Sequence, residues 1–103
     1  MIPDELLRAI RNDLPMQATI RYLGRRAPPS KKYAGYFRFL CPDCGELRAT
    51  VNPRNNLAHC FACDRNFNNI DLLIALGDDF LSAVEVLEQW LREHRKHRTS
   101  SKA

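Results

Sequence analysis

Four cysteines constrain this chain more strongly than any other feature of its sequence. They follow the pattern C-x2-C-x15-C-x2-C, in which Cys41 and Cys44 form the first pair and Cys60 and Cys63 the second. Because two intervening residues let a tight turn aim both sulfurs of a pair at one ion, this spacing is typical of a tetrahedral metal site. Four thiolates fill the coordination sphere, so the pattern predicts one structural Zn2+ ion and no open position for catalysis.

The spacing leaves other uses of the cysteines open. Disulfides are typical of oxidising compartments, and a redox-active Cys-x-x-Cys normally occurs once, in a longer α/β pattern. Iron shares the four-cysteine ligand set with zinc, so the spacing alone does not separate the two metals. His59 precedes Cys60, but four cysteines already complete a tetrahedron, and we expect this histidine to pack beside the site.

The rest of the sequence offers no catalytic constellation. It has no Gly-rich phosphate-binding loop and no serine in a nucleophile elbow. Asp78 and Asp79 follow Gly77 at a predicted helix end, where they are more typical of turn and capping residues than of a metal-binding carboxylate pair. We therefore expect a chain without a catalytic site of its own.

Length and composition favour one small domain that needs an added constraint. The chain has 103 residues, of which 45% are apolar, and a core of this size buries limited area. Its apolar runs are shorter than the roughly 18 residues of a membrane span. Its first residues have neither the basic nor the apolar part of a secretory signal. We therefore expect a cytoplasmic protein with reduced thiols.

Charge is distributed unevenly along the chain. Sixteen Lys and Arg against twelve Asp and Glu give a net charge of +4. No acidic residue occurs between Leu14 and Pro42, and Glu93 alone offsets the basic residues from Arg92 to Lys102. Basic blocks of this kind suit a polyanion, so nucleic acid is the predicted partner, with a merely solvated basic surface as the alternative. The first block contains Arg21, Arg25, Arg26, Lys31, Lys32 and Arg38.

Hydrophobic periodicity and turn residues predict an α+β fold, a small antiparallel zinc-ribbon sheet flanked by N-terminal and C-terminal helices. We expect one domain over residues 1–98 and a disordered tail over residues 99–103. The domain is expected to contain N-terminal helices in 1–24, the zinc ribbon in 33–67 and C-terminal helices in 68–95. Its individual helices are predicted at 3–13, 16–24, 69–76 and 81–94. Strands are predicted at 33–40, 47–51 and 57–61, with a bulge at Gly35 and a basic loop at 25–32.

Segments around the cysteines carry a family resemblance. The run F-R-F-L-C-P at 37–42 leads into the first pair, and N-P at 52–53 precedes H-C-F-A-C at 59–63. Downstream come N-I-D at 69–71 and F-x-x-A-V-x-x-L at 80–87. With these motifs, and with its N-terminal helices, the chain resembles the zinc-binding domain of bacterial and phage DNA primases of the DnaG type.

The sequence departs from that family pattern in two places. Cys44 stands where the family usually has histidine, which would make the site entirely thiolate. The glycines that commonly follow the last ligand are replaced by residues 64–67, D-R-N-F. The resemblance covers the template-reading part of a primase and not its polymerase domain.

The resemblance implies a role as well as a fold. In that family the zinc domain is thought to hold single-stranded template across its sheet, so the resemblance implies a non-catalytic module of DNA replication. It also implies action in trans with a separate primase polymerase or helicase, as on a mobile element. Aromatic rings stack on bases and basic side chains neutralise phosphates. The candidate DNA contacts are Arg38, Arg48, Lys32, Lys31, Tyr36, Tyr33, Arg54 and Arg65.

Two other functions remain open. A protein-interaction or regulatory zinc ribbon would dock a polymerase or helicase through the helices of residues 69–94, and its basic surface would be incidental. An oxidoreductase would use the Cys-x-x-Cys pairs and keep freely reactive thiols. We expect the phenylalanines, among them Phe37, Phe39 and Phe61, mostly to close a small core around the metal.

Overall fold

The chain folds as helices, then a sheet, then helices, which confirms the predicted α+β class. The computed structural model describes residues 2–101 and the side chains of residues 2–96. The helices are α1 (Asp4–Asn12), α2 (Met16–Leu23), the 3-10 turn η1 (Gly24–Arg26), α3 (Asn69–Ala75) and α4 (Phe80–Ser101). The strands are β1 (Ser30–Tyr33), β2 (Tyr36–Phe39), β3 (Ala49–Asn52), β4 (Leu57–Cys60) and β5 (Arg65–Phe67).

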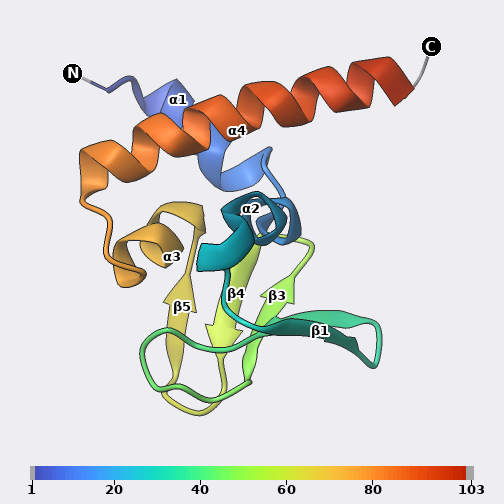
Figure 1. Ribbon diagram of the computed structural model, residues 1–103, viewed down its shortest axis with the longest axis vertical. Coiled ribbons are helices and arrows are strands. Elements are labelled where there is room, and N and C mark those ends of the chain that lie inside the picture. Colours follow the sequence, from blue (N-terminus) through green and yellow to red (C-terminus); the bar gives the residue numbers. More distant parts are fainter. Residues whose placement is uncertain (1, 102–103) are drawn as a thin grey trace.

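The helices gather at one end of the sheet (Figure 1). The long α4 crosses α1 at the top of this view, α2 and α3 lie between them and the strands, and the hairpin of β1 and β2 projects to one side. The buried apolar side chains form one core that joins the helices to one face of the sheet. Its largest fully buried members are Phe39, Phe67, Ile10, Leu14, Met16, Leu72, Leu73 and Leu87.

The sheet is an antiparallel meander with the strand order β1-β2-β3-β4-β5. The predicted single strand over residues 33–40 is wrong, because the chain reverses at Ala34 and Gly35, whose φ angles are 51° and 84°. Two successive positive φ angles are typical of a type I′ hairpin turn. The sheet therefore begins at Ser30, inside the predicted basic loop. All four side chains of β1 are exposed, so no apolar alternation marks this strand in the sequence.

Side chains cap the starts of α3 and α4. Asn68 and Asp71 form a capping box at the start of α3, in which the Asp71 backbone N–H donates to the Asn68 side chain at 2.8 Å. At α4, the Ser82 backbone N–H donates to the Asp79 carboxylate at 2.8 Å, which lowers the pKa of Asp79. Asp78 instead forms an ion pair with Arg26 at 2.9 Å. The acidic pair therefore serves turns and helix ends, as expected.

The last helix is longer than predicted. α4 continues to Ser101, seven residues beyond the predicted end at residue 94. The disordered tail predicted for residues 99–103 lies partly outside the described residues. Within residues 2–101, no helix combines the length and the apolarity needed to cross a bilayer.

A buried asparagine completes the bend between α1 and α2. Pro15 has no N–H, so it lacks the donor that would reach the Arg11 carbonyl in a continuous helix. The Asn56 side chain takes this place, since its Nδ2 donates to the carbonyl oxygens of Arg11 and Leu14, both at 2.7 Å. Its Oδ1 accepts from the Met16 backbone N–H at 2.9 Å. The turn between β3 and β4 is thereby tied to the helices.

Asn69 ties α3 to the same bend. Its side chain is fully buried, and Nδ2 donates to the carbonyl oxygens of Ile10 and Leu14 at 2.8 and 2.7 Å. Its Oδ1 accepts from the Thr19 hydroxyl at 2.7 Å. Every polar atom of this buried amide therefore has a partner, and three helices meet at it.

We expect Asn69→Ala to lower the free energy of unfolding by about 3 kcal/mol, because it leaves the buried Ile10 carbonyl and Thr19 hydroxyl without these partners. The measurement is urea denaturation of the metal-loaded protein. Asn12→Ala is the matched control, since it removes an exposed asparagine from α1, and it should cost less than about 0.5 kcal/mol. Equal losses in the two variants would contradict the role given to Asn69.

Candidate metal centre and the outer face of the sheet

Both cysteine pairs lie in turns with the same backbone geometry. In the first knuckle (residues 41–45) the Gly45 N–H donates to the Cys41 carbonyl at 2.9 Å, and in the second (residues 60–64) the Asp64 N–H donates to the Cys60 carbonyl at 2.8 Å. The residue after each pair is left-handed, with φ of 78° at Gly45 and 59° at Asp64. Aspartate tolerates this conformation better than most residues. The second knuckle therefore keeps the backbone geometry of the first although aspartate, and not glycine, follows its last cysteine.

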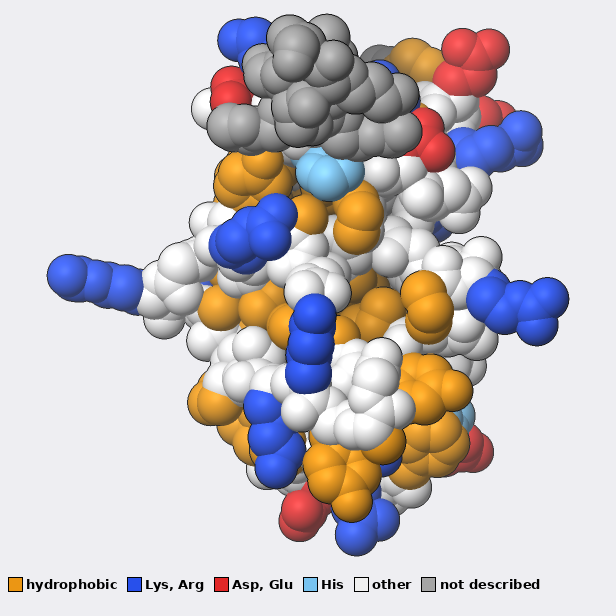
Figure 2. All heavy atoms as spheres, turned by 90° about the vertical axis from the view of Figure 1, so that its right-hand side faces the viewer, with side chains coloured by type: hydrophobic (Ala, Val, Ile, Leu, Met, Phe, Trp, Pro, Cys, Tyr) orange, Lys and Arg blue, Asp and Glu red, His pale blue; other side chains and the backbone are white. Residues whose placement is uncertain are grey.

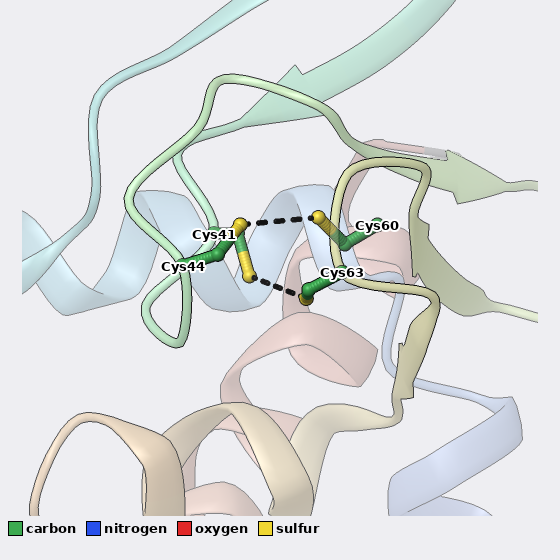
Figure 3. A group of neighbouring side chains, drawn as sticks. All are labelled: Cys41, Cys44, Cys60 and Cys63. Carbon is green, nitrogen blue, oxygen red and sulfur yellow. Dashed lines mark hydrogen bonds between the residues drawn. The ribbon is translucent and has the colours of Figure 1, made fainter.

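The two knuckles bring all four sulfurs together (Figure 3). Cys41 Sγ lies 3.8 Å from Cys63 Sγ, Cys44 Sγ lies 3.6 Å from Cys60 Sγ, and all four atoms lie within 4.8 Å of one another. A disulfide needs sulfurs about 2.05 Å apart. Metal–sulfur bonds of about 2.3 Å in a tetrahedron place the sulfurs about 3.8 Å apart. The separations fit four ligands around one metal ion and do not fit disulfides.

The thiols differ in their readiness to ionise. Burial opposes a charge on Cys60, but hydrogen bonds from the backbone N–H groups of Cys63 and Ala62 lower its pKa to about 7. Burial and the neighbouring sulfurs of Cys60 and Cys41 raise the pKa of Cys63 to about 12. Four thiolates this close repel one another, so a cation between them is what allows all four to ionise together.

An ion pair joins the two knuckles. Arg65 follows the second knuckle, and its Nη1 donates to the Asp43 carboxylate of the first knuckle at 2.8 Å. The Asp43 carboxylate raises the pKa of Arg65. The Arg65 guanidinium also lies 5.2 Å from the centroid of the Phe67 ring. The structure therefore places this predicted DNA contact at the metal centre, where it already has two partners.

His59 packs beside the knuckles without facing the sulfurs. Its Nδ1 lies 2.9 Å from Asn66 Oδ1, and its Nε2 lies 3.2 Å from Asp64 Oδ1. Its ring also meets the Phe61 ring edge-on, with 4.7 Å between the centroids. Side-chain oxygens lie within 3.2 Å of both ring nitrogens, so this histidine is not arranged as a fifth ligand.

Strand register places a row of polar side chains across one face of the sheet. Opposite residues of an antiparallel pair point to the same face. The cross-strand partners run Lys31, Arg38, Thr50, His59 and Asn66 from β1 to β5. The buried core residues of the strands alternate with this row and face the helices. We call the side that carries the row the outer face.

Part of the outer face is concave. One hollow of about 440 Å³ lies over β2, β3 and β4, and a second of about 210 Å³ adjoins it through Arg38 and Phe61. None of the residues lining these two hollows is an Asp or Glu. The first is lined by Tyr36, Arg38, Thr50, Val51, Asn52, Arg54, His59 and Phe61, and the second by Arg38, Leu47, Arg48 and Phe61.

Aromatic rings are accessible on the outer face. Tyr33, Tyr36 and Phe61 expose 55%, 52% and 65% of their surface. The prediction that Phe61 belongs to the core is wrong. Cys60, the residue before it, points into the core. Because side chains alternate between the two faces of a strand, a residue that directly follows an inward-pointing cysteine is expected to point outward. This alternation was the signal that could have placed Phe61 outside the core. Phe39, in contrast, is fully buried, as predicted.

Arg38 lies at the centre of this surface. Its guanidinium carbon is 4.8 Å from the centroid of the Tyr33 ring, a cation–π contact. Its Nε is buried and has no hydrogen-bond partner within the part of the chain that the structure describes. A buried donor without a partner is unfavourable.

The structure does not bring all the predicted DNA contacts together. Lys32 pairs with Phe37 and Arg65 with Cys60, so both point to the opposite side of the sheet from Arg38. Figure 2, seen from the side of the β1–β2 hairpin, shows Lys and Arg side chains spread over that side with few acidic ones among them. The outer face and its rim hold Arg38, Arg48, Arg54, Lys31, Tyr33 and Tyr36.

No protein-family model matches this sequence, and no curated protein matches it at a significant level.

If the four cysteines hold a metal ion, its removal with a chelator should abolish the cooperative thermal transition, because the two knuckles would lose the ion that joins them. Structural zinc in small domains contributes about 10–16 kcal/mol, more than a domain of this size retains otherwise. Circular dichroism with and without EDTA measures the effect, and re-addition of the ion is the control for reversibility. An unchanged melting temperature would contradict a structural role for the ion.

Metal affinity should fall as the pH falls, because the ion must displace protons from the thiols. Cys60 is mostly protonated at pH 6 and mostly ionised at pH 8, given its pKa of about 7. We therefore expect roughly one more proton to be released per ion at pH 6 than at pH 8. Calorimetry in buffers of different ionisation enthalpy counts these protons. Equal release at the two pH values would contradict the lowered pKa of Cys60.

Proposed function

We propose that the four cysteines hold one structural Zn2+ ion. The sulfur separations support a tetrahedral site, and thiolates are soft ligands that zinc binds well. A closed set of four protein ligands leaves no position for a substrate or water, which suits a structural role. Metal analysis tests the proposal, and one equivalent of iron with a thiolate-to-iron absorption band would contradict it.

We propose further that the outer face binds single-stranded DNA. The observation that carries this proposal is the hollow lined by Tyr36, Arg38, Arg54 and Phe61 without any carboxylate. Exposed rings stack on unpaired bases, whereas duplex bases offer their faces only to each other. Arginines beside the rings neutralise the phosphates between successive bases. The alternation of aromatic and basic side chains thus suits a single strand lying across β2, β3 and β4.

The wider role rests on the primase resemblance. A zinc module that holds template but carries no catalytic residues would act in trans, presenting the strand to a separate primase polymerase or helicase. The proposed module would then serve primer synthesis in DNA replication. If so, the wild-type protein should stimulate primer synthesis by a polymerase encoded on the same replicon, whereas a variant deficient in DNA binding should not.

Arg38→Ala combined with Arg48→Ala should weaken binding of a labelled single-stranded oligonucleotide by at least about tenfold. Loss of two phosphate contacts should also reduce the slope of log affinity against log salt by about 1.4, since each contact contributes about 0.7 on single strands. Fluorescence anisotropy at several salt concentrations measures both quantities. Arg8→Ala combined with Arg92→Ala removes the same charge from exposed helix positions and is the matched control.

Phe61→Ala provides a second arm of the same experiment. Loss of one stacking platform should weaken binding by about 1–3 kcal/mol without changing the salt slope. Because Phe61 is 65% exposed, the variant should fold normally. Equal losses in the arginine pair and in its control would mean that binding follows net charge alone, and the outer face would not be the site.

A further inference from the structure

A second exposed apolar surface lies away from the outer face. Within the described residues, six large apolar side chains are exposed, and Ile74, Phe80 and Leu81 are the three that do not belong to the outer face. They expose 43%, 45% and 62% of their surface. All three flank the turn between α3 and α4, which we call the α3–α4 corner (residues 71–85). Contiguous exposed apolar patches are typical of interaction sites.

Backbone hydrogen bonds hold this corner in a tight turn. The Gly77 N–H donates to the Ile74 carbonyl at 3.0 Å, and the Asp78 N–H donates to the Leu73 carbonyl at 3.1 Å. These bonds close the end of α3 and start α4 only a few residues later. A short, hydrogen-bonded turn therefore holds Ile74 near the first residues of α4.

Acidic side chains accompany the apolar ones. Asp71 lies one helical turn from Ile74, and Glu85 lies one turn from Leu81, so each helix places a carboxylate beside an exposed apolar residue. Asp79 caps α4 between them and is also exposed. From residue 66 to residue 91 the sequence has no Lys, Arg or His. Arg26 from η1 pairs with Asp78 at 2.9 Å, but Asp71, Asp79 and Glu85 remain, so the corner is negatively charged as well as apolar.

This charge separates the corner from any nucleic-acid surface. Carboxylates repel phosphates, whereas the hollows of the outer face contain none. In Figure 1 the turn between α3 and α4 lies on the opposite side of the molecule from the β1–β2 hairpin. A strand bound on the outer face would leave the corner accessible.

We propose that the α3–α4 corner docks an amphipathic helix of a partner protein, with apolar residues of that helix over Ile74, Phe80 and Leu81 and its Lys or Arg residues against Asp71, Asp79 and Glu85. An apolar surface formed by two helices suits a helix that presents residues at i, i+3 and i+4. Charge complementarity selects a basic partner. A symmetric pair of copies would instead place the carboxylates against one another, which disfavours self-association through this surface. The proposal does not depend on DNA binding.

Two labelled peptides of about 18 residues test the proposal with zinc-loaded protein. Both carry leucines on one helical face, and the other face carries lysines in one peptide and glutamates in its counterpart. We expect the lysine peptide to bind at least about tenfold more tightly by fluorescence anisotropy. Phe80→Ser combined with Leu81→Ser should lose about tenfold in affinity, whereas Tyr36→Ser combined with Phe61→Ser, matched in exposure, should keep it. A saturating single-stranded oligonucleotide should leave the peptide bound.

Amide chemical-shift changes locate the peptide. Changes confined to residues 71–85 support the corner, and changes on residues 36–61 overturn it. Equal affinity for the two peptides, no binding by the wild-type protein, or equal losses in the two serine pairs would also overturn the proposal. Sedimentation provides a further check. If the wild-type protein is a dimer and Phe80→Ser combined with Leu81→Ser makes it a monomer, the surface binds a second copy of the chain instead. Far-ultraviolet circular dichroism and zinc content confirm that the variants fold.

Discussion

The convergence of four sulfurs from two separate turns is the constraint on which the rest of the sheet depends. Each strand has only three or four residues, and strands this short are marginal without further restraint. The first knuckle connects β2 to β3, and the second connects β4 to β5. One ion between the knuckles would fix the ends of four strands at once. A small sheet can then present a rigid outer face that its own hydrogen bonds would not maintain.

Charge that is segregated along the sequence becomes segregated in space. The stretch without acidic residues, 14–42, forms α2, β1 and β2, whereas the stretch without basic residues, 66–91, forms α3 and most of α4. The two surfaces therefore differ in sign as well as in position. A polyanion and a basic protein segment would each be attracted to one and repelled by the other. A polyanion and a basic protein segment would then bind to separate surfaces of the molecule and would not compete for one site.

The metal centre was the part most open to prediction, because two short spacings determine it locally. β1 was missed, since Lys31 and Lys32 on an edge strand contact no core, and Phe61 was misplaced because an aromatic residue beside a ligand resembles a core residue. The roles of Asn56 and Asn69 depend on partners 40 to 59 residues away, and no local pattern reveals such bonds. β5 was also missed, because its three residues are too few to show an alternation. What the sequence left hidden is thus short, exposed or long-range, and all three escape arguments from periodicity.

The Asn56 side chain replaces the backbone N–H that Pro15 lacks, and this replacement has a consequence for cooperativity. Asn56 lies in the turn between β3 and β4, four residues before Cys60, yet its amide completes the end of α1. Loosening of the second knuckle would therefore reach the bend at Pro15 through this side chain. The ribbon and the N-terminal helices share a boundary that neither can satisfy alone, so we expect unfolding of one to destabilise the other.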